Sequence, residues 1–126
     1  MSGIVWVTRE VAEAVHDRQL AEHGGGTGIR DVGLLESALA RPQNLLHYGE
    51  PDLAALAAAY GFGIARNHPF VDGNKRTAWV AARLFLRLND AALTFDKAEA
   101  TIMMQQLAAG ELAEDEVAAW FRERLT

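Results

Sequence analysis

The sequence predicts an all-α fold, a compact bundle of about six helices forming a single domain over residues 1–126. Half of the residues are hydrophobic, and alanine and leucine dominate among them, which favours helices over a sheet. Apolar residues recur at helical spacing in several segments, and no stretch of any length alternates apolar with polar residues. Residues typical of helix ends separate these segments, so each is expected to be a helix of its own.

The first helix is expected to begin after Thr8, a good N-cap residue, and to run to the glycines that start at Gly24. The apolar run Ile4–Val7 before it is either a strand-like tail or a segment lying on the bundle. Four glycines in the five positions Gly24–Gly28 exclude a stable helix or strand. This loop is either a flexible connector after the helix or a loop beside a functional site.

The second and third helices have clear polar starts. Asp31 is expected to cap a second helix that ends at Pro42. Pro51 and Asp52 open a third helix, which runs to about Asn67. Its many alanines and two glycines allow close approach of neighbouring helices, so we expect it at the centre of the bundle.

A loop from His68 to Gly73 is expected to separate the third helix from a fourth, which opens at Asn74 and ends at about Asn89. Asp96 with Glu99 predicts a capping box for a fifth helix that ends at Gly110. The sixth helix is expected from about Glu114 to Leu125. The residues of the fourth helix expected to be buried are Ala81, Leu84, Phe85 and Leu88.

The loop between the two central helices holds the candidate site. His68 is a candidate general base, and Asp72 offers a hard oxygen ligand for a cation such as Mg²⁺. Asn74 is expected to cap the fourth helix, whose unpaired N–H groups form an anion site that Lys75 and Arg76 strengthen. Phosphate chemistry follows from this set. The structural alternative is an N-cap followed by two solvated cations.

Three neighbouring residues are expected to support this site. Phe70 lies between the polar residues His68 and Asp72 and is expected to point into the core and anchor the loop. Gly73 allows the backbone to approach a phosphate closely. Arg66 lies next to the loop and is expected to contact nucleotide or phosphate.

Charge is unevenly distributed along the chain. The segment Arg66–Arg87 carries five cations against one carboxylate, although the chain as a whole has a net charge of −5. Lys75, Trp79, Arg83 and Arg87 recur every four residues and form one stripe along the predicted fourth helix. The stripe could guide ATP or an acidic partner, but a solvated helix face explains Arg83 and Arg87 equally well.

Composition excludes several classes of protein. The negative net charge argues against a direct nucleic-acid binder. The absence of cysteine excludes disulfides and thiolate metal sites and fits a reducing cytoplasm. The N-terminus lacks the features of a signal peptide, and the longest apolar stretch, Leu53–Ala65, is too short to span a bilayer. We therefore expect a cytoplasmic protein with no membrane contact.

The segment HPFVDGNKR, His68 to Arg76, resembles the active-site motif of the Fic/Doc family, HxFx(D/E)(G/A)N(G/K)R. Lys75 is similar to the variant found in the Doc branch of toxin–antitoxin systems, whereas AMP-transferring members have glycine there. Those members also carry a further arginine three residues after the motif, where this chain has Trp79. The segments His16–Gln43 and Arg76–Asn89 are also similar to the Doc branch.

The resemblance implies a bacterial protein and its function. In the Doc branch the nucleotide presents its γ-phosphate to the target, which implies a Mg²⁺- and ATP-dependent protein kinase. The family's substrate is a threonine of elongation factor Tu, and its phosphorylation arrests translation. In this reading His68, Asp72, Lys75 and Arg76 are catalytic, Asp72 binds the metal, and Arg66, Gly73, Asn74, Lys75 and Arg76 bind nucleotide. An AMP-transferase and a non-catalytic binding toxin remain alternatives.

The resemblance also implies a regulator. The chain lacks the inhibitory pattern (S/T)xxxE(G/N) that many Fic proteins carry, so inhibition is expected from a separate chain. The expected partner is a Phd-type antitoxin, whose disordered C-terminal segment folds into an apolar groove beside the active site.

Overall fold

The computed structural model describes residues 3–126 and folds them into six helices, without a β-strand in this range. They are α1 (Arg9–His23), α2 (Val32–Tyr48), α3 (Leu53–Asn67), α4 (Asn74–Leu88), α5 (Lys97–Ala108) and α6 (Glu114–Arg124). The predicted all-α bundle is confirmed. The single domain over 1–126 stays a prediction, and its residues Met1 and Ser2 lie outside the described range. None of the helices described combines the length and the apolar character that a membrane span needs.

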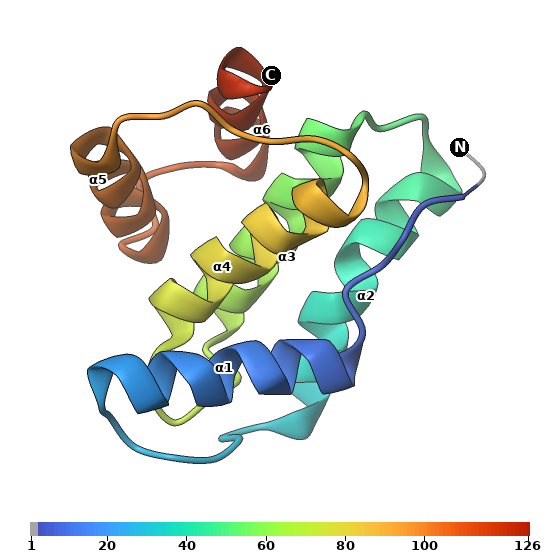
Figure 1. Ribbon diagram of the computed structural model, residues 1–126. Coiled ribbons are helices and arrows are strands. Elements are labelled where there is room, and N and C mark those ends of the chain that lie inside the picture. The colour runs from blue at the N-terminus through green and yellow to red at the C-terminus, as the bar shows by residue number, and fades with distance from the viewer. Residues whose placement is uncertain (1–2) are drawn as a thin grey trace.

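Helix α3 is the centre of the bundle, as predicted. It runs beside α4 and packs against α2, α4 and α6, while α1 crosses one end of the α3–α4 pair (Figure 1). Glycines permit this packing: a Cβ added to Gly63 would lie 3.1 Å from the Cα of Ala38 on α2. On the opposite side, Gly61 faces Ala82 of α4. Close approach of three helices leaves most of α3 buried.

Side-chain caps start four of the helices at the predicted residues. The capping carboxylates or hydroxyl belong to Thr8, Asp31, Asp52 and Asp96. The capping box predicted at Asp96 is only half present, because the carboxylate of Glu99 accepts from Arg124 of α6 at 3.4 Å. The return bond expected there occurs instead at α6, where Glu116 accepts from the N–H of Ala113 at 3.0 Å.

The prediction that the second helix ends at Pro42 is wrong. Helix α2 continues through Pro42 to Tyr48. Proline removes one helical hydrogen bond, at a cost of about 3 kcal/mol in a helix interior. Pro42 is itself buried, on the same stripe as Leu35, Ala38 and Leu39, and this stripe packs on α3. Burial along the whole stripe therefore outweighs the local preference to stop.

The buried face of α4 differs in part from the prediction. Ala81 and Phe85 are buried as expected, but Leu84 is only half-buried and Leu88 is 40% exposed. Leu86 is fully buried in their place. The core face of α4 is rotated because the helix packs on α3 along one side and on α1 near its start.

The N-terminal segment Ile4–Val7 lies on the bundle, which settles the choice left open by the sequence. The N–H of Val7 donates to the hydroxyl of Tyr60 on α3 at 2.9 Å, and the ring of Trp6 stacks on Phe85. Burial raises the pKa of Tyr60 to about 12, so its hydroxyl stays protonated at any ordinary pH. The segment is therefore held by this buried polar contact, by aromatic packing and, at Val5, by two hydrogen bonds with the amide of Asn89.

Candidate active site

The loop 68–73 joins α3 to α4 as predicted, and His68 opens it in an unusual conformation. His68 caps the C-terminus of α3 with φ 49° and ψ 55°, and its N–H donates to the carbonyl of Ile64. Left-handed backbone is uncommon in residues other than glycine and needs support from its surroundings. The imidazole is exposed, so it is accessible to an incoming hydroxyl group.

Asn74 does not cap α4, which corrects the sequence prediction. The cap is Gly73, in left-handed conformation with φ 77°, and Asn74 is the first helical residue. Its side chain reaches back across the loop: Oδ1 accepts from the N–H of Phe70 at 2.9 Å, and Nδ2 donates to the carbonyl of Phe70 at 3.0 Å. Asn74 is 8% exposed, so its amide closes the loop upon itself inside the protein. The anion site therefore consists of backbone N–H groups in the first turn of α4.

Asp72 presents its carboxylate at the outer side of the loop. One oxygen accepts from the N–H of Gly73 at 2.8 Å, and the other lies 3.4 Å from the N of Gly26. Residues 3–126 contain no group of three or more histidine, cysteine, aspartate or glutamate side chains able to hold a metal ion together. One exposed carboxylate fits a cation that takes most of its ligands from water and substrate phosphates, as Mg²⁺ does.

The glycine-rich loop, Gly24–Gly28, lies against the loop 68–73, called the active-site loop below because it carries the candidate catalytic residues. Val71 donates to the carbonyl of Gly28 at 3.1 Å, and Ile29 and Phe70 form an isolated antiparallel bridge. A Cβ added to Gly25 would lie 2.8 Å from an Asp72 carboxylate oxygen. The glycine-rich loop therefore lies beside the candidate site, and its role there stays a prediction.

Two residues that the sequence analysis did not identify, Arg30 and His16, contact backbone carbonyls in and beside the loop 68–73. Arg30 donates from Nε to the carbonyl of His68 at 2.7 Å and from its terminal nitrogen to the carbonyl of Asn67 at 2.9 Å. His16 of α1 stacks on Phe70 and has its Nε2 2.8 Å from the carbonyl of Asp72. Phe70 is buried, as predicted, and anchors the loop. No local sequence pattern indicates either contact, because both join residues far apart in the chain.

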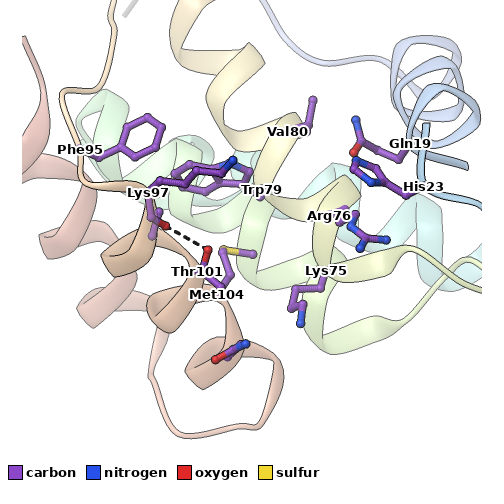
Figure 2. Close-up of a pocket in the computed structure, with 12 residues that line it drawn as sticks. Gln19, His23, Lys75, Arg76, Trp79, Val80, Phe95, Lys97, Thr101 and Met104 are labelled. Carbon is purple, nitrogen blue, oxygen red and sulfur yellow. Dashed lines mark hydrogen bonds between the residues drawn. The ribbon is translucent and has the colours of Figure 1, made fainter. Parts of the chain in front are cut away.

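A groove of about 530 Å³ begins at the first turn of α4 and extends between α1, α4 and α5 (Figure 2). Cations enter it from two sides: Lys75 and Arg76 come from α4, and Lys97 from α5. The lining residues are Gln19, His23, Lys75, Arg76, Trp79, Val80, Phe95, Lys97, Ala100, Thr101, Met104 and Gln105. No carboxylate is among them, so the groove combines an apolar floor with positive charge.

The other predicted cations lie outside this groove. Arg66 is exposed and stacks over the ring of Phe62, beside Gly110 in the α5–α6 connection. Arg83 covers the rings of Trp79 and Phe95 at 5.4 and 4.9 Å. Neither reaches the groove, although Trp79 of the same stripe lines it. The predicted contact of Arg66 with nucleotide stays a prediction.

Comparison with known proteins identifies the family of this chain. The profile of the Fic/DOC family matches residues 6–86, which include both loops and the start of α4. The chain is 44% identical to Toxin Doc of Mycolicibacterium smegmatis over 100 residues, covering 76% of this chain and 77% of that one. It is 37% identical to Protein kinase doc of Escherichia phage P1 over 117 residues, covering 92% of each. The chain is therefore a member of the Fic/DOC family.

Proposed function

We propose that this protein is the toxin of a type II toxin–antitoxin system and acts as a protein kinase. It transfers the γ-phosphate of ATP to a threonine hydroxyl of elongation factor Tu and so arrests translation. The observation that carries the proposal is the position of Lys75, the second residue of α4, whose side chain lines the groove at the first turn of that helix. The similarity to a relative named as a protein kinase supports the same reaction.

The residues of the loop and those of α4 have different roles in the proposed reaction. The exposed imidazole of His68 takes the proton from the threonine hydroxyl as its oxygen forms a bond to the γ-phosphorus. The bond from that phosphorus to the β–γ bridging oxygen breaks, and ADP leaves. Lys75, Arg76 and the N–H groups of the first turn of α4 hold the phosphate oxygens and stabilise their negative charge. The loop contributes chiefly by holding these groups in position.

Asp72 is the residue that would hold Mg²⁺, and its exposed single carboxylate fits an ion shared with substrate phosphates. When bound, Mg²⁺ neutralises the charge that develops on the transferred group. Asp72 is oriented by the N–H groups of Gly73 and Gly26, so its carboxylate is held at the outer edge of the loop.

The test is the intact mass of elongation factor Tu after incubation with this protein, ATP and Mg²⁺. We expect the gain of one phosphate, with a rate lowered about 10²- to 10⁴-fold in His68→Ala, the range for loss of a general base. His47→Ala is the matched control, because it removes another exposed histidine, located in the last turn of α2. The control should retain the wild-type rate.

Other masses would contradict parts of the proposal. A gain of one AMP would show that Lys75 does not set the orientation of the nucleotide, and the protein would be an AMP-transferase. An unchanged mass would rule out this target. Toxicity that survives both His68→Ala and Asp72→Ala would indicate a toxin that acts by binding alone.

We further propose that the groove binds the C-terminal segment of a Phd-type antitoxin. Its apolar floor and the cations Lys75, Arg76 and Lys97 are complementary to an amphipathic segment with acidic side chains. Lys97→Glu should weaken binding of such a segment several-fold, on the order of 1 kcal/mol for an exposed ion pair. Arg87→Glu, the same change of charge on an exposed residue outside the groove, should leave calorimetric affinity unchanged. Equal losses in both variants would contradict binding in the groove.

A further inference from the structure

His16 is a buried titratable residue that the proposed reaction does not use. It lies on α1, is 2% exposed, and is one of three buried polar residues in the described range, with Asn74 and Thr77. A buried polar side chain is retained at a cost unless its hydrogen bonds are made. The partners of His16 therefore indicate what it does.

One face and one edge of the His16 ring contact the loop 68–73. The ring is nearly parallel to that of Phe70, with 3.9 Å between centroids and 7° between planes. Its Nε2 lies 2.8 Å from the carbonyl oxygen of Asp72. A carbonyl oxygen only accepts, so Nε2 carries the hydrogen and donates it. The same edge of the ring lies beside Gly73, where an added Cβ would be 3.7 Å from Cδ2.

The two sides of Asp72 are held very differently. Its carboxylate is exposed and receives only backbone N–H groups, one of them at 3.4 Å. Its carbonyl, by contrast, is bound by a side chain that α1 and Phe70 keep in one orientation. The peptide between Asp72 and Gly73 leads directly into the first turn of α4. Fixing this peptide therefore fixes both the carboxylate and the N–H groups that face phosphate.

We propose that His16 is a positioning residue for phosphoryl transfer, acting through the hydrogen bond from Nε2 to the carbonyl of Asp72. The inference rests on the proposed kinase function. Outer partners of this kind change metal affinity or activity by about 10–100-fold when they are removed. A purely structural histidine would instead change stability without a matching effect on the rate.

Two substitutions separate the donor from the ring. His16→Phe keeps an aromatic ring against Phe70 and removes the donor. His16→Gln removes the ring and keeps an amide nitrogen at a similar distance along the side chain. We expect His16→Phe to lower kcat about 10–100-fold and to raise the Mg²⁺ concentration for half-maximal rate, with little change in KM for the protein substrate. His16→Gln should recover most of the lost kcat even if its thermal midpoint is the lower of the two.

A wild-type kcat in His16→Phe would overturn the proposal. So would a kcat in His16→Gln that is no better than in His16→Phe while both proteins are folded, because the donor would then not matter. Amide hydrogen exchange of residues 70–74, measured by NMR, tests the same contact without any substrate. Exchange should accelerate in His16→Phe and remain close to wild type in His16→Gln.

The exchange measurement also separates this proposal from the kinase proposal. If the wild-type protein transfers no phosphate, the kinase proposal fails and the exchange rates alone decide the role of His16. Unchanged exchange in His16→Phe would then overturn the positioning role. Faster exchange confined to the loop would support it for whatever reaction the site performs.

Discussion

At each end of α4, the side-chain amide of an asparagine binds a backbone segment from outside the helix. At the start of the helix, the amide of Asn74 binds both the N–H and the carbonyl of Phe70. At the end, the amide of Asn89 binds the N–H and the carbonyl of Val5, each at 2.8 Å. Each asparagine thus closes a backbone segment onto the helix with a matched pair of hydrogen bonds.

The two asparagines differ in their burial and in the segment that they hold. Asn74 is buried and holds the loop that carries His68 and Asp72. Asn89 holds the N-terminal segment at a more exposed position, far from the loop. A motif residue can therefore shape a site through its contacts with the backbone alone. We therefore expect changes at the first end to alter activity, and changes at the second to alter stability only.

Truncation of both asparagines is the strongest test of this difference between the two ends. Asn74→Ala leaves two buried groups of Phe70 unpaired, at about 1–3 kcal/mol each, and should slow phosphate transfer about 10–100-fold by displacing the loop. Asn89→Ala is the matched control. Water can reach the freed groups of Val5, so it should cost about 0.5–1.5 kcal/mol and no activity. Urea unfolding and the phosphate transfer rate measure the two effects.

An equal loss of rate in both variants would contradict the division between the two ends. The same holds if Asn74→Ala lowers stability without slowing transfer, because the loop would then keep its geometry without the amide.

Helices whose starts are determined locally were predicted well. Thr8, Asp31, Asp52 and Asp96 each accept from a backbone N–H three residues on, so the signal and its partner lie within one turn. The prediction that the second helix ends at Pro42 was wrong because the end of that helix is not determined locally. The continuation of α2 depends on packing against α3, and no residue near Pro42 in the chain shows that packing.

The candidate site shows the same limit. The motif identified His68 and Asp72, and the structure places both on one loop. Asn74 was assigned to the cap because asparagine is a common cap residue, whereas its partner is a buried peptide of the loop. His16 and Arg30 were missed because their contacts reach the loop from α1 and from the segment between the glycine-rich loop and α2. Such long-range contacts have no signal in a single sequence.

A second test compares two glycine substitutions in the glycine-rich loop, which lies against the loop 68–73. Gly25→Ala should slow phosphate transfer several-fold, since the new Cβ would lie 2.8 Å from the Asp72 carboxylate. Gly28→Ala is the control for backbone strain: its φ of +99° is also left-handed, but nothing lies within 4 Å of the added Cβ. Each substitution should cost stability of about 1–2 kcal/mol, because alanine disfavours positive φ. The rates, measured at saturating ATP, separate contact with Asp72 from strain.

If Gly28→Ala slows transfer as much as Gly25→Ala, the order of the loop matters rather than contact with Asp72. That result would indicate that the conformation of the whole glycine-rich loop affects phosphate transfer.

Substitutions at Asp52, at the end of the bundle away from the loop, should have the weakest effects. Asp52 caps α3 and accepts two hydrogen bonds, of 2.6 and 3.0 Å, from Arg122 of α6. The hydrogen bond from Arg122 lowers the pKa of Asp52 below its ordinary value of 3.8. Stability from this pair is therefore complete above about pH 4 and is lost as the pH falls through the lowered pKa. Both side chains are half exposed, so its contribution is below about 1 kcal/mol.

Two substitutions at Asp52 separate the ion pair from the cap. Asp52→Asn keeps an acceptor for the N–H of Ala55 and removes the charge, so its deficit in urea unfolding should be present at pH 7 and shrink towards pH 3. Asp52→Ala should lose about 1 kcal/mol more at pH 7, because it also removes the cap. Neither should change the rate of phosphate transfer. A deficit of Asp52→Asn that grows as the pH falls would contradict the lowered pKa, and a slower transfer would show that this end of the bundle is coupled to the loop.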